Sequence, residues 1–94
     1  MQSIQQFDPA RFLDDEETIQ AYLDAALEDD TPGAFLVALG NVAKARGMTS
    51  VAKAAGVGRE SLYKTLAAGA NPEFKTVEKI VRALGMKLTI SPAL

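Results

Sequence analysis

The feature that most constrains the fold is a short segment, residues 49–64, in which small and branched residues surround a glycine turn. Gly56 begins this turn, where the backbone favours a positive φ that glycine adopts without strain. Two short helices joined this tightly meet at a steep angle, and an alanine at the contact lets them approach closely. Aliphatic side chains five residues apart then fill the angle. We expect the inside of this motif to be formed by Val51, Ala52, Gly56, Val57 and Leu62, with Ala55 behind them.

The composition favours a small binding protein over an enzyme. The chain has 94 residues, 48% of them hydrophobic, which is enough for one small core. It contains no Cys and no His, so thiolate metal sites and the commonest general base are excluded, and we expect no cofactor and no metal. Its apolar runs are far shorter than the roughly 20 residues of a membrane span, and residues 1–14 lack the pattern of a secretory signal. We therefore expect a cytoplasmic protein without membrane contact.

Apolar periodicity predicts five helices. The first has an apolar stripe that runs from Ile19 to Leu27 at helical spacing. Asp14, Thr31 before a proline, and then Thr49 or Ser50 occupy positions typical of N-caps. The predicted helices cover about residues 15–29, 32–46, the segment from the cap at 49 or 50 to 55, 59–67 and 74–84.

Residues 86–91 have a different period. Met86, Leu88 and Ile90 alternate with polar residues, which predicts a short strand. A single strand leaves its backbone groups unpaired, so it needs a neighbour. Three neighbours are open: residues 3–7 of the same chain, the same strand of a second copy, or the sheet edge of another protein. The expected fold class is all-α, with five helices, the first of them acidic, and a short C-terminal β-strand.

Charge is divided unevenly along the chain. Residues 1–31 carry nine acids against Arg11 alone, a net charge of −8. Residues 32–94 carry nine bases against three acids, a net charge of +6, and the two halves together give −2. One interpretation is ordinary solubilising charge on solvated helix faces. The other is two surfaces for two kinds of partner.

The glycine-turn segment and its surroundings resemble the Xre/Cro-type helix-turn-helix domains. The resemblance runs without a gap from Val51 to about Met86, and residues 32–46 supply the family's first helix, so it covers about two-thirds of the chain. We expect a helix-turn-helix domain over residues 32–94, which includes the C-terminal strand. It implies a five-helix, lambda-repressor-like bundle. The sequence departs from the family at Thr65, where an aliphatic or aromatic residue is usually buried. We expect Leu66 to take over that packing, with a slight rotation of the second helix of the motif. The matching segments are Gly56-Val57-Gly58-Arg59, Gly69-Ala70-Asn71-Pro72 and residues 76–85.

This resemblance implies that the second helix of the motif enters the major groove of DNA. Its outward side chains would read base edges, with an arginine on guanine and a glutamate on cytosine. The alternative is that these polar residues only solvate a helical bundle. The candidate base-reading residues are Gly58, Arg59, Glu60, Tyr63 and Lys64, and the candidate phosphate-binding residues are Thr49, Ser50, Lys53, Asn71 and Lys75, with Lys44 and Arg46 as further backbone candidates.

The whole chain also resembles the HigA-like addiction-module antidote proteins, on Phe7-Asp8-Pro9-Ala10, residues 21–28, residues 35–48 and Glu60-Ser61-Leu62-Tyr63-Lys64. Such antitoxins pair with a small basic toxin of the RelE/ParE–HigB kind, a ribosome-associated mRNA endonuclease, and they repress their own operon. The resemblance therefore implies two partners: the toxin, met by the acidic arm 1–31, and double-stranded operator DNA. The expected apolar anchors for the toxin are Ile4, Phe7, Phe12, Leu13 and Tyr22.

Three other interpretations remain open. Residues 1–31 would be a plain capping helix if the charge were only solubilising. A stand-alone, phage-type repressor would have no toxin, and a protein-interaction module would have no DNA. Because operators are two-fold symmetric, the DNA-binding interpretation predicts that the protein is a homodimer. The C-terminal strand and the helix at 74–84 are its expected contact surfaces.

Overall fold

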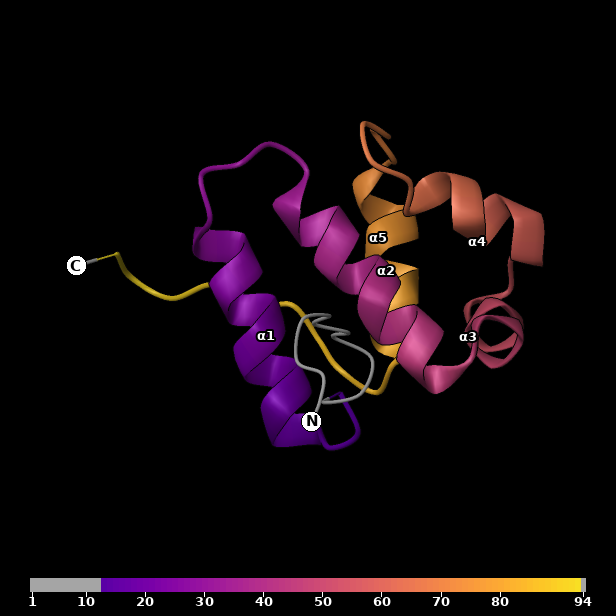
Figure 1. Cartoon of the computed structure of the whole chain (residues 1–94), viewed down its shortest axis with the longest axis horizontal. Coiled ribbons are helices and arrows are strands. Elements are labelled where there is room, and N and C mark those ends of the chain that lie inside the picture. Colours follow the sequence, from indigo (N-terminus) through magenta and orange to yellow (C-terminus); the bar gives the residue numbers. More distant parts are fainter. Residues whose placement is uncertain (1–12, 94) are drawn as a thin grey trace, which may run out of the picture.

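Five helices account for most of residues 13–93, the part of the chain that this computed structural model describes (Figure 1). The all-α class is therefore confirmed for these residues. Each helix lies within about two residues of its predicted range. The helices are α1 (Glu16–Glu28), α2 (Ala34–Arg46), α3 (Met48–Ala55), α4 (Arg59–Thr65) and α5 (Phe74–Ala83).

One hydrophobic core joins all five helices. α1 packs along α2, and α3 contacts α2, α4 and α5. In the described residues no polar or charged side chain is buried. Burying one large aliphatic side chain stabilises a fold by about 1.5–3 kcal/mol, so a few such residues hold this arrangement together. The largest fully buried side chains are Ile19, Leu39, Val42, Leu62, Ile80 and Leu84.

The helix starts differ from the predicted caps. Asp15, not Asp14, is the N-cap of α1, and its Oδ1 accepts the Thr18 N–H at 2.7 Å. Thr31 forms a turn with the following proline, and the N-cap of α2 is Gly33, in the left-handed conformation. α3 begins at Met48 after Gly47, so Thr49 and Ser50 lie in its first turn. In each case the true cap lies one to three residues from the predicted one. The Asp15 side chain caps α1, whereas α2 and α3 begin after a glycine with no side-chain cap.

The predicted C-terminal strand is absent from the described residues. Met86 and Leu88 are half-buried against the core, whereas Ile90 is 100% exposed. Residues 86–93 pass beside α1 and run outward beyond it (Figure 1). A strand needs a hydrogen-bonded neighbour, and none of residues 13–93 supplies one. The alternation of apolar residues therefore reflects one side of an extended tail that rests on the core.

None of the helices in the described part of the chain is long and apolar enough to cross a membrane.

Candidate functional site

The turn between α3 and α4 fixes the direction in which α4 leaves the core. Gly56 has φ 73° and ψ 30°, a left-handed conformation that suits glycine. Its N–H and that of Val57 donate to carbonyls of the last turn of α3, with Val57 N to Ala52 O at 3.0 Å. This is the hydrogen-bond pattern of a Schellman C-cap. Leu62, on the inner face of α4, then lies fully buried in the core.

The other expected inner residues of this segment are also in or against the core. Val51 and Ala52 are each 3% exposed, and Ala55 is 8% exposed. Val57 is half-buried and packs against them. Beyond Thr65, which is half-buried, Leu66 ends α4 and is itself buried at 8% exposure. α4 is thus fixed to the core by the turn at Gly56 before it, by Leu62 on its inner face and by Leu66 at its end.

Four of the five candidate base-reading residues lie on α4 and the fifth, Gly58, is its N-cap; all five are exposed. Arg59 lies along Tyr63: its Nη2 donates to the Tyr63 hydroxyl at 3.4 Å, and its guanidinium carbon is 5.4 Å from the ring centroid. A cation–π contact at an exposed site contributes only about 0.5–1 kcal/mol, so the guanidinium can leave the ring for another partner at small cost. Glu60 and Lys64 lie beside this pair on the same helix.

The candidate phosphate-binding residues lie on two elements. Thr49, Ser50 and Lys53 are exposed on the first two turns of α3, where no side chain caps the helix. Asn71 lies in the loop before α5, and Lys75 in the first turn of α5; both are exposed. A helix start with free N–H groups and nearby hydroxyls is a favourable place for a phosphate oxygen.

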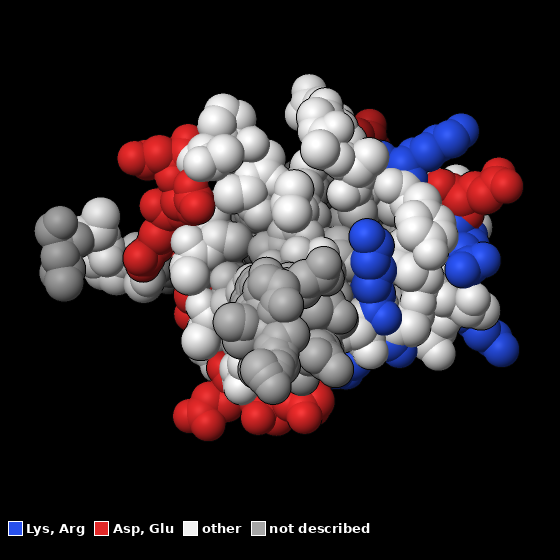
Figure 2. Space-filling view, viewed as in Figure 1, with Lys and Arg blue, Asp and Glu red and all other residues white. Residues whose placement is uncertain are grey.

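The two signs of charge occupy different sides of the molecule (Figure 2). Red acidic side chains gather over the α1 side of this view. Blue basic side chains gather over the α3–α4 side, with some acidic ones among them. Within residues 13–31 there are eight acids and no base, and within residues 32–93 nine bases and three acids. The uneven distribution of charge along the sequence therefore gives the folded chain an acidic side and a basic side.

Two of the five predicted toxin anchors have structural roles in the chain itself. Leu13 is 3% exposed in the core, so it does not present itself to a partner in this conformation. Tyr22 is half-buried, and its hydroxyl accepts a hydrogen bond from Asn41 Nδ2 at 2.8 Å, which ties α1 to α2. Apolar residues suit a core as well as an interface, which is why the sequence pattern did not separate the two roles. Ile4, Phe7 and Phe12 lie outside the described residues.

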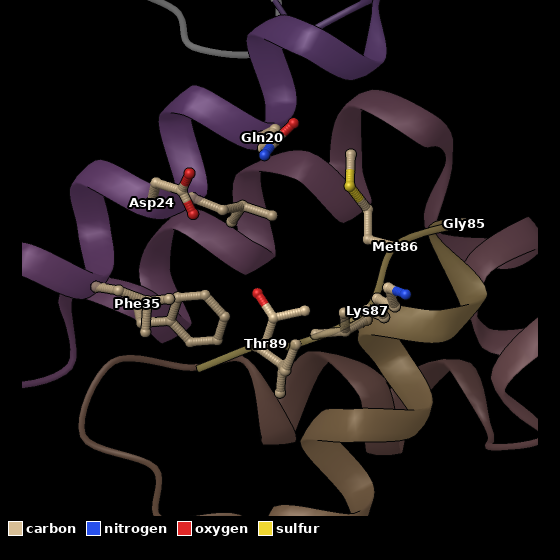
Figure 3. A pocket seen from close by; sticks show the side chains of 11 residues that line it. Gln20, Asp24, Phe35, Gly85, Met86, Lys87 and Thr89 are labelled. Carbon is tan, nitrogen blue, oxygen red and sulfur yellow. The ribbon is translucent and has the colours of Figure 1, made fainter. Parts of the chain in front are cut away.

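A groove that the sequence did not reveal lies between α1 and the C-terminal tail (Figure 3). It has a volume of about 320 Å³ and is open to solvent. Leu27, the last residue of the apolar stripe of α1, is 55% exposed at this groove. The negative charge that crowds the end of α1 was the only signal in the sequence for a surface here.

These features define a small helical protein with one core, a basic side around α3 and α4, and an acidic side around α1. The chain belongs to the family of probable addiction module antidote proteins, whose model matches residues 3–92. It is similar to an uncharacterized protein of Haemophilus influenzae, with 42% identity over 89 residues that cover 95% of this chain and 92% of the relative. No solved structure matches the chain. Membership in an antidote family implies a cognate toxin as partner.

Proposed function

We propose that this antidote is a DNA-binding antitoxin, which neutralises a toxin of the RelE/ParE–HigB kind and represses the operon that encodes both. The observation that carries the DNA-binding part is the outward Arg59–Tyr63 pair on α4. It follows a glycine turn that fixes the angle of α4, and it lies on the basic side of the molecule. An outward, base-reading second helix after the turn is what the resemblance to the Xre-type domains implies.

In this proposal α4 lies in the major groove, and α3 crosses the DNA backbone. Arg59 leaves the Tyr63 ring and donates two hydrogen bonds to guanine O6 and N7. Glu60 accepts from cytosine N4, and Tyr63 contacts a thymine methyl group or a phosphate. Gly58 lets the base edges approach the start of α4, and Lys64 lies further along the groove.

The remaining contacts go to the DNA backbone. Thr49 and Ser50 offer hydroxyls beside the free N–H groups at the start of α3, and Lys53 adds a positive charge one turn later. Asn71 and Lys75 extend these contacts to a second element. Such contacts position the protein without reading sequence, and each neutralised phosphate makes binding more dependent on salt. Two copies of the chain then meet the two halves of a symmetric operator.

Toxin neutralisation rests on the acidic side. A strongly acidic surface accelerates the encounter with a basic protein and covers cationic surface that would otherwise bind RNA. Both activities are binding, and neither needs a catalytic group from this chain.

The test is a titration of the full chain with a duplex that carries the module's own promoter and with a random duplex of equal length, at several salt concentrations. We expect tighter binding to the promoter, and an affinity for both duplexes that falls steeply as salt rises. Equal, salt-independent binding would reject the DNA-binding part and leave a protein-interaction module. A chain that binds the promoter but fails to neutralise the toxin would be a stand-alone repressor.

A further inference from the structure

The groove between α1 and the C-terminal tail combines an apolar floor with one acidic and one basic residue, Asp24 and Lys87. We call it the α1 groove; its main lining residues are Leu23, Asp24 and Leu27 of α1, Phe35 of α2, and Leu88 of the tail. Figure 3 shows Asp24 and Phe35 on one side of the space and Met86, Lys87 and Thr89 on the other. A volume of about 320 Å³ accommodates a few large side chains.

The apolar part of the groove is more exposed than the fold requires. Leu27 is 55% exposed, although it lies one turn from the buried Leu23. Phe35 and Leu88 are half-buried at the same place. Leu27, Phe35 and Leu88 thus form a small apolar surface around the hollow, large enough for one or two side chains of a partner.

The acids at the end of α1 are arranged against the stability of their own helix. Asp24 and Glu28 are four residues apart, where like charges repel. Glu28, Asp29 and Asp30 crowd the C-terminal end, where negative charge is unfavourable, and the last turn holds no base. The one ion pair among residues 13–93 joins Arg82 to Glu78, on α5. Asp29 accepts a hydrogen bond from the Thr31 N–H at 2.7 Å. An external base is therefore the partner that Asp24, Glu28 and Asp30 lack among residues 13–93.

We propose that the α1 groove binds a basic, amphipathic segment of the cognate toxin. An apolar side chain of that segment would pack against Leu27 and Phe35, and its lysines or arginines would meet Asp24 and Glu28. Lys87 also lines the groove, so the lining itself is neutral and the attraction comes from Asp24 together with the acids that follow it in α1. This inference rests on the proposed neutralisation of the toxin and assigns that activity to the α1 groove.

A second copy of the chain, residues 1–12 and a small molecule are less suitable occupants of the α1 groove, the first two because of their charge and the third because of the shape of the groove. A second copy docked symmetrically through this groove would bring the acids of two α1 helices together. Residues 1–12 of the same chain carry Asp8 and Arg11, so they offer no net positive charge. A small molecule would be held poorly, because the space is open and its volume lies at the low end of the range for ligand pockets.

The experiment measures binding of the module's purified toxin to the full chain and to four variants by calorimetric titration. Leu27→Ser and Glu28→Lys test the groove. Val37→Ser, which changes a 46% exposed aliphatic residue on α2, is the matched apolar control. Glu73→Lys, at the N-cap of α5, is the matched charge control, since the groove is lined by the opposite end of that helix. The groove variants should each weaken binding about tenfold or more, and the controls less than about threefold.

Glu28→Lys also separates binding from folding. A lysine there suits the C-terminal end of α1 and attracts Asp24 four residues earlier. Its melting temperature should therefore equal or exceed that of the unmodified chain while toxin binding falls. A binding site that failed only because the helix was damaged would show both quantities falling together.

The outcomes are distinct. Full toxin affinity in both groove variants overturns the groove and leaves neutralisation standing. Failure of the unmodified chain to bind the toxin overturns the groove and neutralisation together. Loss of self-association in Leu27→Ser with unchanged toxin binding, measured by sedimentation, assigns the groove to a second copy and also overturns the proposal.

Discussion

α1 and α4 lie on one core and differ in how their charges relate to their own helices. α4 has Glu60 in its first turn and Lys64 in its last, which is the order that a helix dipole favours, although Arg59 at its first position opposes the dipole. α1 also begins with acids, but it ends with Glu28, Asp29 and Asp30, against the dipole. Local helix stability thus accounts for Glu60 and Lys64 of α4, and the Thr31 N–H bonded at 2.7 Å accounts for Asp29 after α1. It accounts neither for Arg59 at the start of α4 nor for Glu28 and Asp30 at the end of α1. In both helices, the charges that oppose the dipole are the ones that a partner outside the chain would explain.

The largest expected effect tests whether the two helices share one core. Ile19 of α1 and Leu62 of α4 are both fully buried. Ile19→Ala and Leu62→Ala should each lower the free energy of unfolding by about 2–5 kcal/mol, because each leaves a cavity. Chemical denaturation followed by circular dichroism should show one transition in both variants. If Ile19→Ala left the main transition in place and removed only some helical signal, α1 would be an independent appendage.

The next effect concerns only α4. Arg59→Ala should weaken binding to the promoter by about 1–3 kcal/mol and relax one base preference, because it removes a bidentate contact with guanine. Titration of promoter variants by fluorescence anisotropy measures this. Lys53→Ala is the matched control on α3: it should weaken binding to all sequences and lower the salt slope by about one. An equal loss on random DNA would show that Arg59 contacts the backbone instead of a base.

A smaller effect concerns the start of α1. The backbone N–H of Thr18 donates to Asp15 and lowers the pKa of that carboxyl below its ordinary value of 3.8. A lowered pKa in the folded chain means that the cap stabilises the protein above about pH 4 and that this contribution is lost as the pH falls further.

Asp15→Ala should therefore reduce the melting temperature at pH 7, and the difference from the unmodified chain should shrink toward pH 2. Asp15→Asn is the control, since asparagine caps a helix without titrating. A difference that stays constant with pH would mean that the charge of Asp15 is not what stabilises the helix.

The smallest effect concerns the start of α4, which no side chain caps. Gly58 has φ −72° and ψ 152°, and a Cβ there would lie 3.9 Å from Ser61 Oγ, an ordinary contact. Gly58→Ser should raise the free energy of unfolding by a few tenths of a kcal/mol, because serine can cap α4 as Asp15 caps α1. A thermal melt measures the gain. A loss of stability would mean that the turn needs glycine at Gly58 as well as at Gly56.

Local features of this fold were predictable from the sequence, and features that depend on distant partners were not. The turn at Gly56 followed from the chemistry of a few adjacent residues, and the helices followed from their apolar period. Leu27 belongs to the same period, yet the neighbours of α1 cover only part of the stripe. The alternation at Met86, Leu88 and Ile90 did not distinguish a paired strand from a tail lying on the core. Leu13 and Tyr22 were assigned to a partner because a core and an interface select the same side chains.

If α1 and α4 share one core, they unfold together. A ligand bound at α1 then also keeps α4 folded. A ligand that binds only the folded chain reduces the unfolded fraction in proportion to its concentration over its dissociation constant. Proteases that act on unfolded chains would then remove the unliganded antidote faster than the liganded one. The concentration of folded antidote, and with it of α4, would rise with the amount of toxin bound at α1. This coupling needs no conformational change between the two helices.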